Sequence, residues 1–264
     1  MRPVDQQAFE DFQAVIREEI PGFKVGYKDQ SSLMKFLGFL ARPFNPKFLT
    51  NYITTWGNTV YFPSTEFVMK EPGNALCVLA HEFVHLCDYR DHGFWGFQVT
   101  YAAPQIYALI PMLAYAILGS VVPLLIFFGC YLAGAALAKW KWLMWSVFGI
   151  GVLAALVTGW LLSGFWLFLL VGSLVPLAMS SSSRTKWELR GYTMTLATFR
   201  WMFERNPPPA FFDFIRTQFT GPDYFFMCRN DAKIDTALSI AYEKIKDESI
   251  RDEKVYDLVY NFFV

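Results

Sequence analysis

A stretch of 91 residues, from residue 93 to residue 183, carries only two charged side chains, Lys139 and Lys141. In the rest of the chain about one residue in four is charged, which is the density of an ordinary soluble protein. A run this apolar is typical of membrane-embedded chain. We therefore expect two polar flanks, 1–92 and 184–264, to form one domain that a transmembrane insertion interrupts.

The two charge-free runs on either side of the paired lysines are each about twice as long as a membrane helix. As helices they would measure roughly 69 and 63 Å, against a hydrocarbon core of about 30 Å. Gly119-Ser120 and Ser163-Gly164 supply breaks near the two midpoints. The sequence predicts four transmembrane spans, at about 101–118, 121–138, 142–160 and 162–179.

Four spans return the chain to the side of the membrane on which it started. They place Arg90, Arg184 and Lys186 on the same face as the two lysines of the insertion, while the opposite turns carry no charge. The positive-inside rule makes this face cytoplasmic. The first seven residues also lack the apolar run of a secretory signal. We expect an integral, multi-pass membrane protein of the inner or plasma membrane with a cytoplasmic polar domain.

Charge also excludes two classes of function. The 23 basic and 23 acidic residues cancel, which removes the broad attraction that nucleic-acid-binding proteins use, so no nucleic-acid partner is expected. The four spans contain no Asp, Glu, Lys, Arg or His that could serve as a proton relay or ion ladder, which argues against a transporter.

The three histidines of the chain lie within twelve residues, and two belong to an HExxH motif that begins at His81 and ends at His85. On a helix this spacing places both imidazoles on one face, close enough to hold one zinc ion. Glu82 then lies beside the metal and can take a proton from water. A break at Pro72-Gly73 followed by Asn74 predicts the start of the helix, with Asn74 as its N-cap.

A third protein ligand has candidates close to the motif. Asp91 follows His85 by six residues, but no glycine precedes it to let the helix reverse. His92 would lie some 16 Å along a continuous helix from His81, too far to share its metal.

A further candidate, Glu188, lies in the first polar segment after the spans. On a helix it would share a face with Tyr192 and Thr195, and Gly191 would let a second helix approach closely. The alternative is that Glu188 is a solvated charge beside its basic neighbours, Lys186 and Arg190.

The order of these parts resembles the gluzincin metallopeptidases, among them the membrane-embedded HtpX-like and CaaX prenyl endopeptidases. In those proteins an HExxH helix is followed by membrane spans and then by a helix with a glutamate ligand. The resemblance covers roughly residues 50–195, and HExxH is its one strongly specific motif. It implies that His81, His85 and Glu188 hold Zn²⁺ and that Glu82 is the catalytic base.

The chain departs from those peptidases after the third ligand. They commonly show ExxxD, whereas this chain has Glu188 followed four residues later by Tyr192, closer to the ExxxY form of small gluzincin-like proteins. Asp88, one turn beyond His85, is therefore a candidate to orient the ligands. Tyr192 is a candidate to stabilise the oxyanion, with plain packing as the alternative.

A β-hairpin is predicted before the HExxH helix. Residues 51–56 and 59–63 are rich in β-formers and are joined by Gly57-Asn58. In gluzincins a strand at this place pairs with substrate, and Thr59–Phe62 occupies it here; the alternative is an ordinary sheet edge.

Apolar periodicity predicts further elements. Residues 32–41 form an apolar helix that is either buried, which we favour, or lies in the bilayer interface. The other predicted elements are helices at 5–20, 210–219, 231–247 and 251–262 and a strand at 23–29.

The sequence thus predicts a mainly α fold with a small β-hairpin or sheet, in which a four-helix transmembrane insertion interrupts a gluzincin-like metallopeptidase domain. The expected function is that of a zinc metalloendopeptidase, a hydrolase acting on peptide or protein substrates at the cytoplasmic face of a lipid bilayer. The alternative is a non-catalytic membrane scaffold with a structural zinc site. Glu82 argues against the scaffold, because a structural site closed by four ligands needs no neighbouring base.

Overall fold

The computed structural model describes residues 4–42, 46–103, 121–130, 132–133, 140–174, 180–221 and 226–264. The chain divides into two compact units. Both flanks, Met1–Tyr101 and Ser180–Val264, belong to one unit, and Ala102–Met179 forms the other. Residues 93–101, which were expected to belong to the apolar insertion, are therefore part of the first unit.

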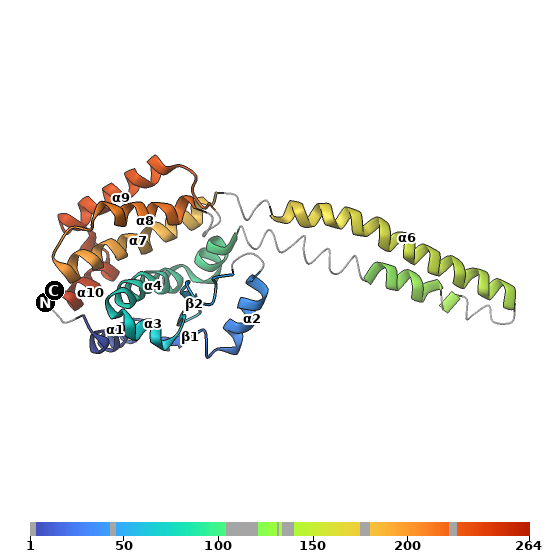
Figure 1. Ribbon diagram of the computed structural model, residues 1–264, viewed down its shortest axis with the longest axis horizontal. Coiled ribbons are helices and arrows are strands. Elements are labelled where there is room, and N and C mark those ends of the chain that lie inside the picture. The colour runs from blue at the N-terminus through green and yellow to red at the C-terminus, as the bar shows by residue number, and fades with distance from the viewer. Residues whose placement is uncertain are drawn as a thin grey trace. The chain divides into compact units, whose positions relative to one another are not determined.

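The first unit is mainly helical with one small sheet (Figure 1). Its helices are α1 (Gln6–Glu19), α2 (Ser32–Ala41), α3 (Thr65–Lys70), α4 (Pro72–Gly93), the π-helix η1 (Phe94–Val99), α7 (Ser182–Phe203), α8 (Pro209–Thr220), α9 (Asp231–Lys246), the 3₁₀-helix η4 (Ser249–Asp252) and α10 (Lys254–Phe263).

The predicted hairpin is confirmed and belongs to a three-stranded sheet. Strands β2 (Thr54–Trp56) and β3 (Thr59–Phe62) are antiparallel, and Gly57 adopts φ +58° in the turn, a conformation that glycine enters without steric cost. Strand β1 (Lys24–Tyr27) pairs in parallel with the other side of β3.

The predicted role of residues 59–62 is wrong. Because β3 lies between β1 and β2, it is neither a sheet edge nor able to pair with a substrate. The pairing of β1 with β3 joins segments more than thirty residues apart in the sequence, so no local pattern indicates it. The edge strands of the described sheet are β1 and β2.

The core of the first unit surrounds α4. Four of its apolar residues, Leu76, Leu79, Ala80 and Phe83, are fully buried. Phe12 of α1 meets the ring of Phe83 edge to face, with 6.1 Å between the ring centroids. This packing fixes the side of α4 opposite to the histidines.

The predicted N-cap at Asn74 is wrong, because α4 begins two residues earlier. Pro72 occupies the first turn, and the N–H of Ala75 donates to the carbonyl of Glu71 at 2.9 Å. Proline suits this position because the first amides of a helix have no partner inside the helix.

The preferred prediction for α2, burial, is wrong for most of its large side chains. Met34 is fully buried, whereas Leu33, Phe36 and Phe39 are 42%, 59% and 73% exposed. The helix therefore packs through one face and leaves an apolar face uncovered by the described residues of its unit.

The second unit contains a short helix, Val121–Cys130, beside the long helix α6 (Lys141–Leu174). Gly159 lies opposite Pro123, and Gly151 lies opposite Cys130. The two helices are therefore antiparallel, and both are drawn side by side in Figure 1. In the described part of the chain, one helix is long and apolar enough to cross a membrane, over Trp142–Leu161.

The predicted break at Ser163-Gly164 is wrong, because α6 continues through it to Leu174. Serine and glycine weaken a helix by about 1 kcal/mol or less per residue and, unlike proline, leave every hydrogen-bond donor in place. The predicted spans 142–160 and 162–179 are thus parts of one helix as far as residue 174. Residues 104–118, 131, 134–138 and 175–179 of the predicted spans lie outside the described residues, so the four-span arrangement stays a prediction.

Candidate metal centre

Two imidazoles face α7 from the middle of α4. His81 and His85 are both buried, and their Nε2 atoms lie 3.1 Å apart. The opposite face of α4 packs in the core, which fixes the rotation of the helix about its axis and directs the histidine face toward α7.

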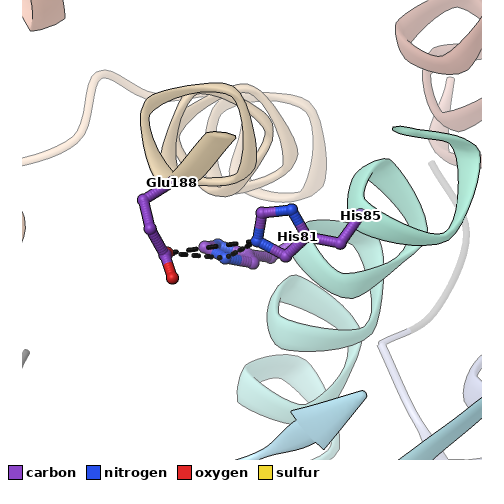
Figure 2. A group of neighbouring side chains, drawn as sticks. All are labelled: His81, His85 and Glu188. Carbon is purple, nitrogen blue, oxygen red and sulfur yellow. Dashed lines mark hydrogen bonds and ion pairs between the residues drawn. The ribbon is translucent and has the colours of Figure 1, made fainter. Parts of the chain in front are cut away.

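The third polar side chain comes from α7. Glu188 is buried, and its Oε2 atom lies 3.5 Å from His81 Nε2 and 4.0 Å from His85 Nε2. Figure 2 shows the carboxylate pointing from its helix toward both imidazoles. Gly191 allows this approach, because a Cβ atom there would lie only 2.5 Å from His81 Nε2. The predicted close contact between the two helices at this glycine is confirmed.

The three facing atoms lie close enough together to bind one metal ion. Ligands bound at 2.0–2.1 Å in a tetrahedron lie about 3.3 Å from one another. The separations of 3.1, 3.5 and 4.0 Å lie within about 0.7 Å of that value. A buried His-His-Glu group can therefore hold a metal ion, and three protein ligands leave a fourth position for water or substrate.

Hydrogen bonds around His81 favour the form that binds a metal. The hydroxyl of Thr195 donates to the carbonyl of Gly191 at 3.2 Å, so its oxygen can accept the Nδ1–H of His81, also at 3.2 Å. The proton on Nδ1 leaves a lone pair on Nε2, which faces the other two ligands.

An unpaired carboxylate oxygen of Glu188 is also consistent with a cation-binding site. Oε2 of Glu188 makes no hydrogen bond to a described residue, and it lies 3.5 and 4.0 Å from the two imidazole nitrogens. A buried carboxylate oxygen without a partner is costly, and a bound metal ion would remove that cost.

The other carboxylate oxygen of Glu188 is held by Tyr101, whose hydroxyl donates to Oε1. Burial alone would raise the pKa of Glu188, but its contact with His81 and the charge of Arg184 lower it to about 2. The carboxylate is therefore ionised at neutral pH, as a metal ligand must be. Burial lowers the pKa of His85 to about 3, which keeps its imidazole neutral.

Glu82 is anchored by the sheet. Thr55 of β2 donates its hydroxyl to Glu82 Oε2 at 2.6 Å. Burial raises the pKa of Glu82 above the usual range of a carboxyl group. Lys28 is fully buried; its ammonium group donates to the carbonyl of Phe48 at 2.7 Å, and burial lowers its pKa to about 7.

Two cavities of the first unit reach this centre. The larger, of about 590 Å³, is lined by His81, Glu82 and Tyr192 together with aromatic side chains that include Phe199 and Phe211. The smaller, of about 280 Å³, is lined by Thr55, Glu82, His85, Tyr101, Arg184 and Glu188. The residues of the HExxH motif are therefore open to ligands from two directions.

The other predicted candidates take different places. Asp91 forms an ion pair with Arg90 at 2.7 Å, and His92 Nδ1 contacts the carbonyl of Asp88 at 3.1 Å. Neither belongs to the metal-binding group found among the described residues. The predicted orienting role of Asp88 is wrong, because its carboxylate pairs with Arg190 at 3.1 Å and the Nδ1 of His85 has no partner in the described part of the chain.

Tyr192 packs against the metal centre. Its ring meets that of His81 edge to face, with 4.8 Å between the centroids. Sequence reasoning missed two functional candidates, Tyr101 and Thr55. Tyr101 stands at the start of a predicted span and Thr55 in a predicted strand, and neither position carries a local signal for contact with the HExxH helix or its partner.

Comparisons with models of protein families, with curated proteins and with solved structures found no match.

Proposed function

We propose that this protein is a membrane-attached zinc metallopeptidase in which His81, His85 and Glu188 hold the metal and Glu82 is the general base. The observation that carries the proposal is the triangle of two Nε2 atoms and one carboxylate oxygen with an HExxH glutamate beside it. The order of the ligand-bearing helices along the chain supports the resemblance to gluzincins, because an HExxH helix supplies two ligands and a later helix supplies the third.

Zinc at such a site would polarise the scissile carbonyl and lower the pKa of a bound water molecule. Glu82 accepts the proton of the attacking water and passes it to the leaving amine. The hydrogen bond from Thr55 occupies Oε2 of Glu82, which leaves Oε1 to receive that proton. Tyr192 lines the larger cavity beside His81, where its phenol is the proposed donor to the developing oxyanion.

The proposed substrate is a peptide or protein chain. Strand β2 is a sheet edge and lines the smaller cavity through Thr54 and Thr55, so an extended peptide can pair with its backbone. The larger cavity offers room and aromatic walls for side chains next to the cleaved bond.

The proposed attachment is an integral one through the second unit. Because both flanks belong to one compact unit, an insertion that crosses a bilayer must do so an even number of times. One crossing is proposed for Trp142–Leu161. Arg90, Arg184 and Lys186 flank the insertion, and by the positive-inside rule these charges support a metal centre on the cytoplasmic side.

The deciding experiment combines metal analysis with a cleavage assay on the purified full chain, using a peptide library as substrate. Wild type is expected to contain about one zinc per chain and to cleave, and Glu82→Gln is expected to keep its zinc and lose at least a hundredfold in activity. Glu66→Gln is the matched control, because Glu66 is an exposed residue that pairs only with Lys70 among the described residues.

The same data test the scaffold alternative. A chain that contains zinc but shows no cleavage in either form would favour a structural site. Equal activity of wild type and Glu82→Gln would remove Glu82 from the mechanism.

A further inference from the structure

Helix α2 presents an apolar face that no described residue of its unit covers. Leu33, Phe36 and Phe39 recur every three residues along one side of the helix and are 42%, 59% and 73% exposed. Met34 and Gly38 lie on the other side, where Met34 is buried and a Cβ atom at Gly38 would overlap the side chain of Leu49. The packed face is therefore already used, and the exposed aromatic face needs a different partner.

The charged side chains within α2 and in the segment that follows it have one sign. Between Asp29 and Glu66 the only charged side chains are Lys35, Arg42 and Lys47. Aromatic and aliphatic side chains combined with basic ones are typical of helices that lie in the headgroup region of anionic membranes. A protein partner with an acidic rim is less consistent with the chain, because a bilayer is proposed on other grounds.

The position of α2 connects this face to the metal centre. Gly38 packs on Leu49, and the adjacent Phe48 lines the smaller cavity together with Glu188. Tyr101, another residue of that cavity, is directly followed by the first residue of the apolar unit.

We propose that the Leu33–Phe36–Phe39 face of α2 docks in the interface of an anionic lipid bilayer and holds the smaller cavity close to the membrane surface. The inference rests on the proposed membrane attachment, although it does not depend on catalysis. It implies that substrates reach β2 as segments next to a membrane rather than as freely diffusing peptides.

The test uses the unmodified full chain in nanodiscs of phosphatidylglycerol and phosphatidylcholine that contain a lipid with a carbene precursor near the top of its acyl chain. After illumination, trypsin releases residues 36–47, which carry the exposed aromatics, and residues 234–244, which carry Ile240. Ile240 is a matched control, because it is an apolar residue of α9 that is 57% exposed. The peptide 142–184 reports on the insertion.

We expect at least fivefold more lipid adduct on 36–47 than on 234–244, and at least a twofold loss when phosphatidylglycerol is omitted. Phe36→Ser combined with Phe39→Ser is expected to bring the label on the helix down to that of 234–244, while Ile240→Ser changes nothing.

Equal labelling of 36–47 and 234–244 would overturn the inference, provided that 142–184 is labelled. A chemical cross-link from Lys35 to a second copy of the chain would also overturn the inference, because the second copy would then occupy this face. The same holds if α2 carries no lipid adduct because the insertion covers it. If 142–184 itself carries no lipid, the proposed membrane attachment fails instead, so the two failures are distinguishable.

Discussion

Gly191→Ala tests whether the close approach of α7 to α4 is what forms the metal centre. The added methyl group would lie 2.5, 2.6 and 2.8 Å from Nε2, Cε1 and Cδ2 of His81. Ordinary contacts between such atoms are about 3.5 Å, so the imidazole or the helix must move by about 1 Å. Tyr192 and His85 both stand against the ring with centroids 4.8 Å away, which limits its escape.

A displacement of about 1 Å is half the length of a zinc–nitrogen bond. His81 should therefore no longer reach a zinc ion that His85 and Glu188 bind at normal distances. We expect zinc affinity to fall at least 10- to 100-fold, the size of effect seen when the surroundings of a ligand are altered. The free energy of unfolding of the metal-free protein should change only modestly. Overpacking destabilises by about 1–3 kcal/mol, and replacing glycine with alanine in a helix stabilises by about 1 kcal/mol.

The assay is thermal unfolding of the full chain in detergent with and without zinc, together with a chelator competition for affinity. A ligand at 100 times its Kd adds about 2.7 kcal/mol to stability, so wild type should show a clear zinc-dependent rise in Tm that the variant lacks. Gly149→Ala is the control, because a Cβ atom there meets nothing within 4 Å. If Gly191→Ala bound zinc as tightly as wild type, the proposed packing of His81 against α7 would be refuted.

Three further predictions concern groups around the centre. Tyr101→Phe removes the donor to Oε1 of Glu188 and should weaken zinc binding about 10- to 100-fold, as measured by chelator competition. Thr55→Val frees the carboxylate of Glu82 and should lower kcat about tenfold with little change in KM, whereas Thr55→Ser should restore it, as measured by steady-state peptide cleavage. Lys28→Met should change how stability depends on pH: the pKa of Lys28 is lowered from 10.5 to about 7 by burial, so above pH 7 the unfolded chain binds the extra proton. Wild type should therefore gain stability relative to the variant as pH rises from 7 toward 10, by at most about 1.4 kcal/mol per pH unit, in unfolding experiments at fixed zinc concentration.

Each of these predictions has a control and a contrary outcome. Tyr242→Phe removes an exposed hydroxyl that donates to Asn206, and an equal loss of zinc in both variants would deny Tyr101 a specific role. A Thr55→Ser protein as slow as Thr55→Val would show that the hydroxyl does not act through Glu82. For the pH series the control is Lys233→Met, and parallel pH curves for wild type and Lys28→Met would contradict the burial argument.

Local patterns were sufficient for most elements of the first unit. The periodic apolar residues of α1, the β-formers around Gly57-Asn58 and the HExxH spacing all describe contacts within a few residues, and the structure has the corresponding helix, hairpin and helix. The close contact of α7 with α4 at Gly191 was expected from helix geometry, whereas the choice of Glu188 as a ligand was implied by the resemblance to gluzincins.

The errors concern choices that depend on distant parts of the chain. The parallel pairing of β1 moves β3 to the centre of the sheet, and a strand pattern looks the same at an edge as at the centre. Ser163-Gly164 destabilises a helix only slightly, whereas a continuous helix satisfies every backbone hydrogen bond of the apolar segment. Serine and glycine, which often end helices in polar sequences, therefore do not end this one. Asp88 shares a helix with the ligands, yet the position of Arg190 on α7 determines its partner.

The two halves of the metal centre are separated by the apolar unit in the order of synthesis. At about 5–20 residues per second, several seconds pass between translation of the HExxH helix and translation of Glu188. During that interval the chain can offer a metal ion only two imidazoles, and the hydrophobic unit must leave the ribosome first. The proposed peptidase would therefore lack its third metal ligand until the whole apolar segment has been synthesised.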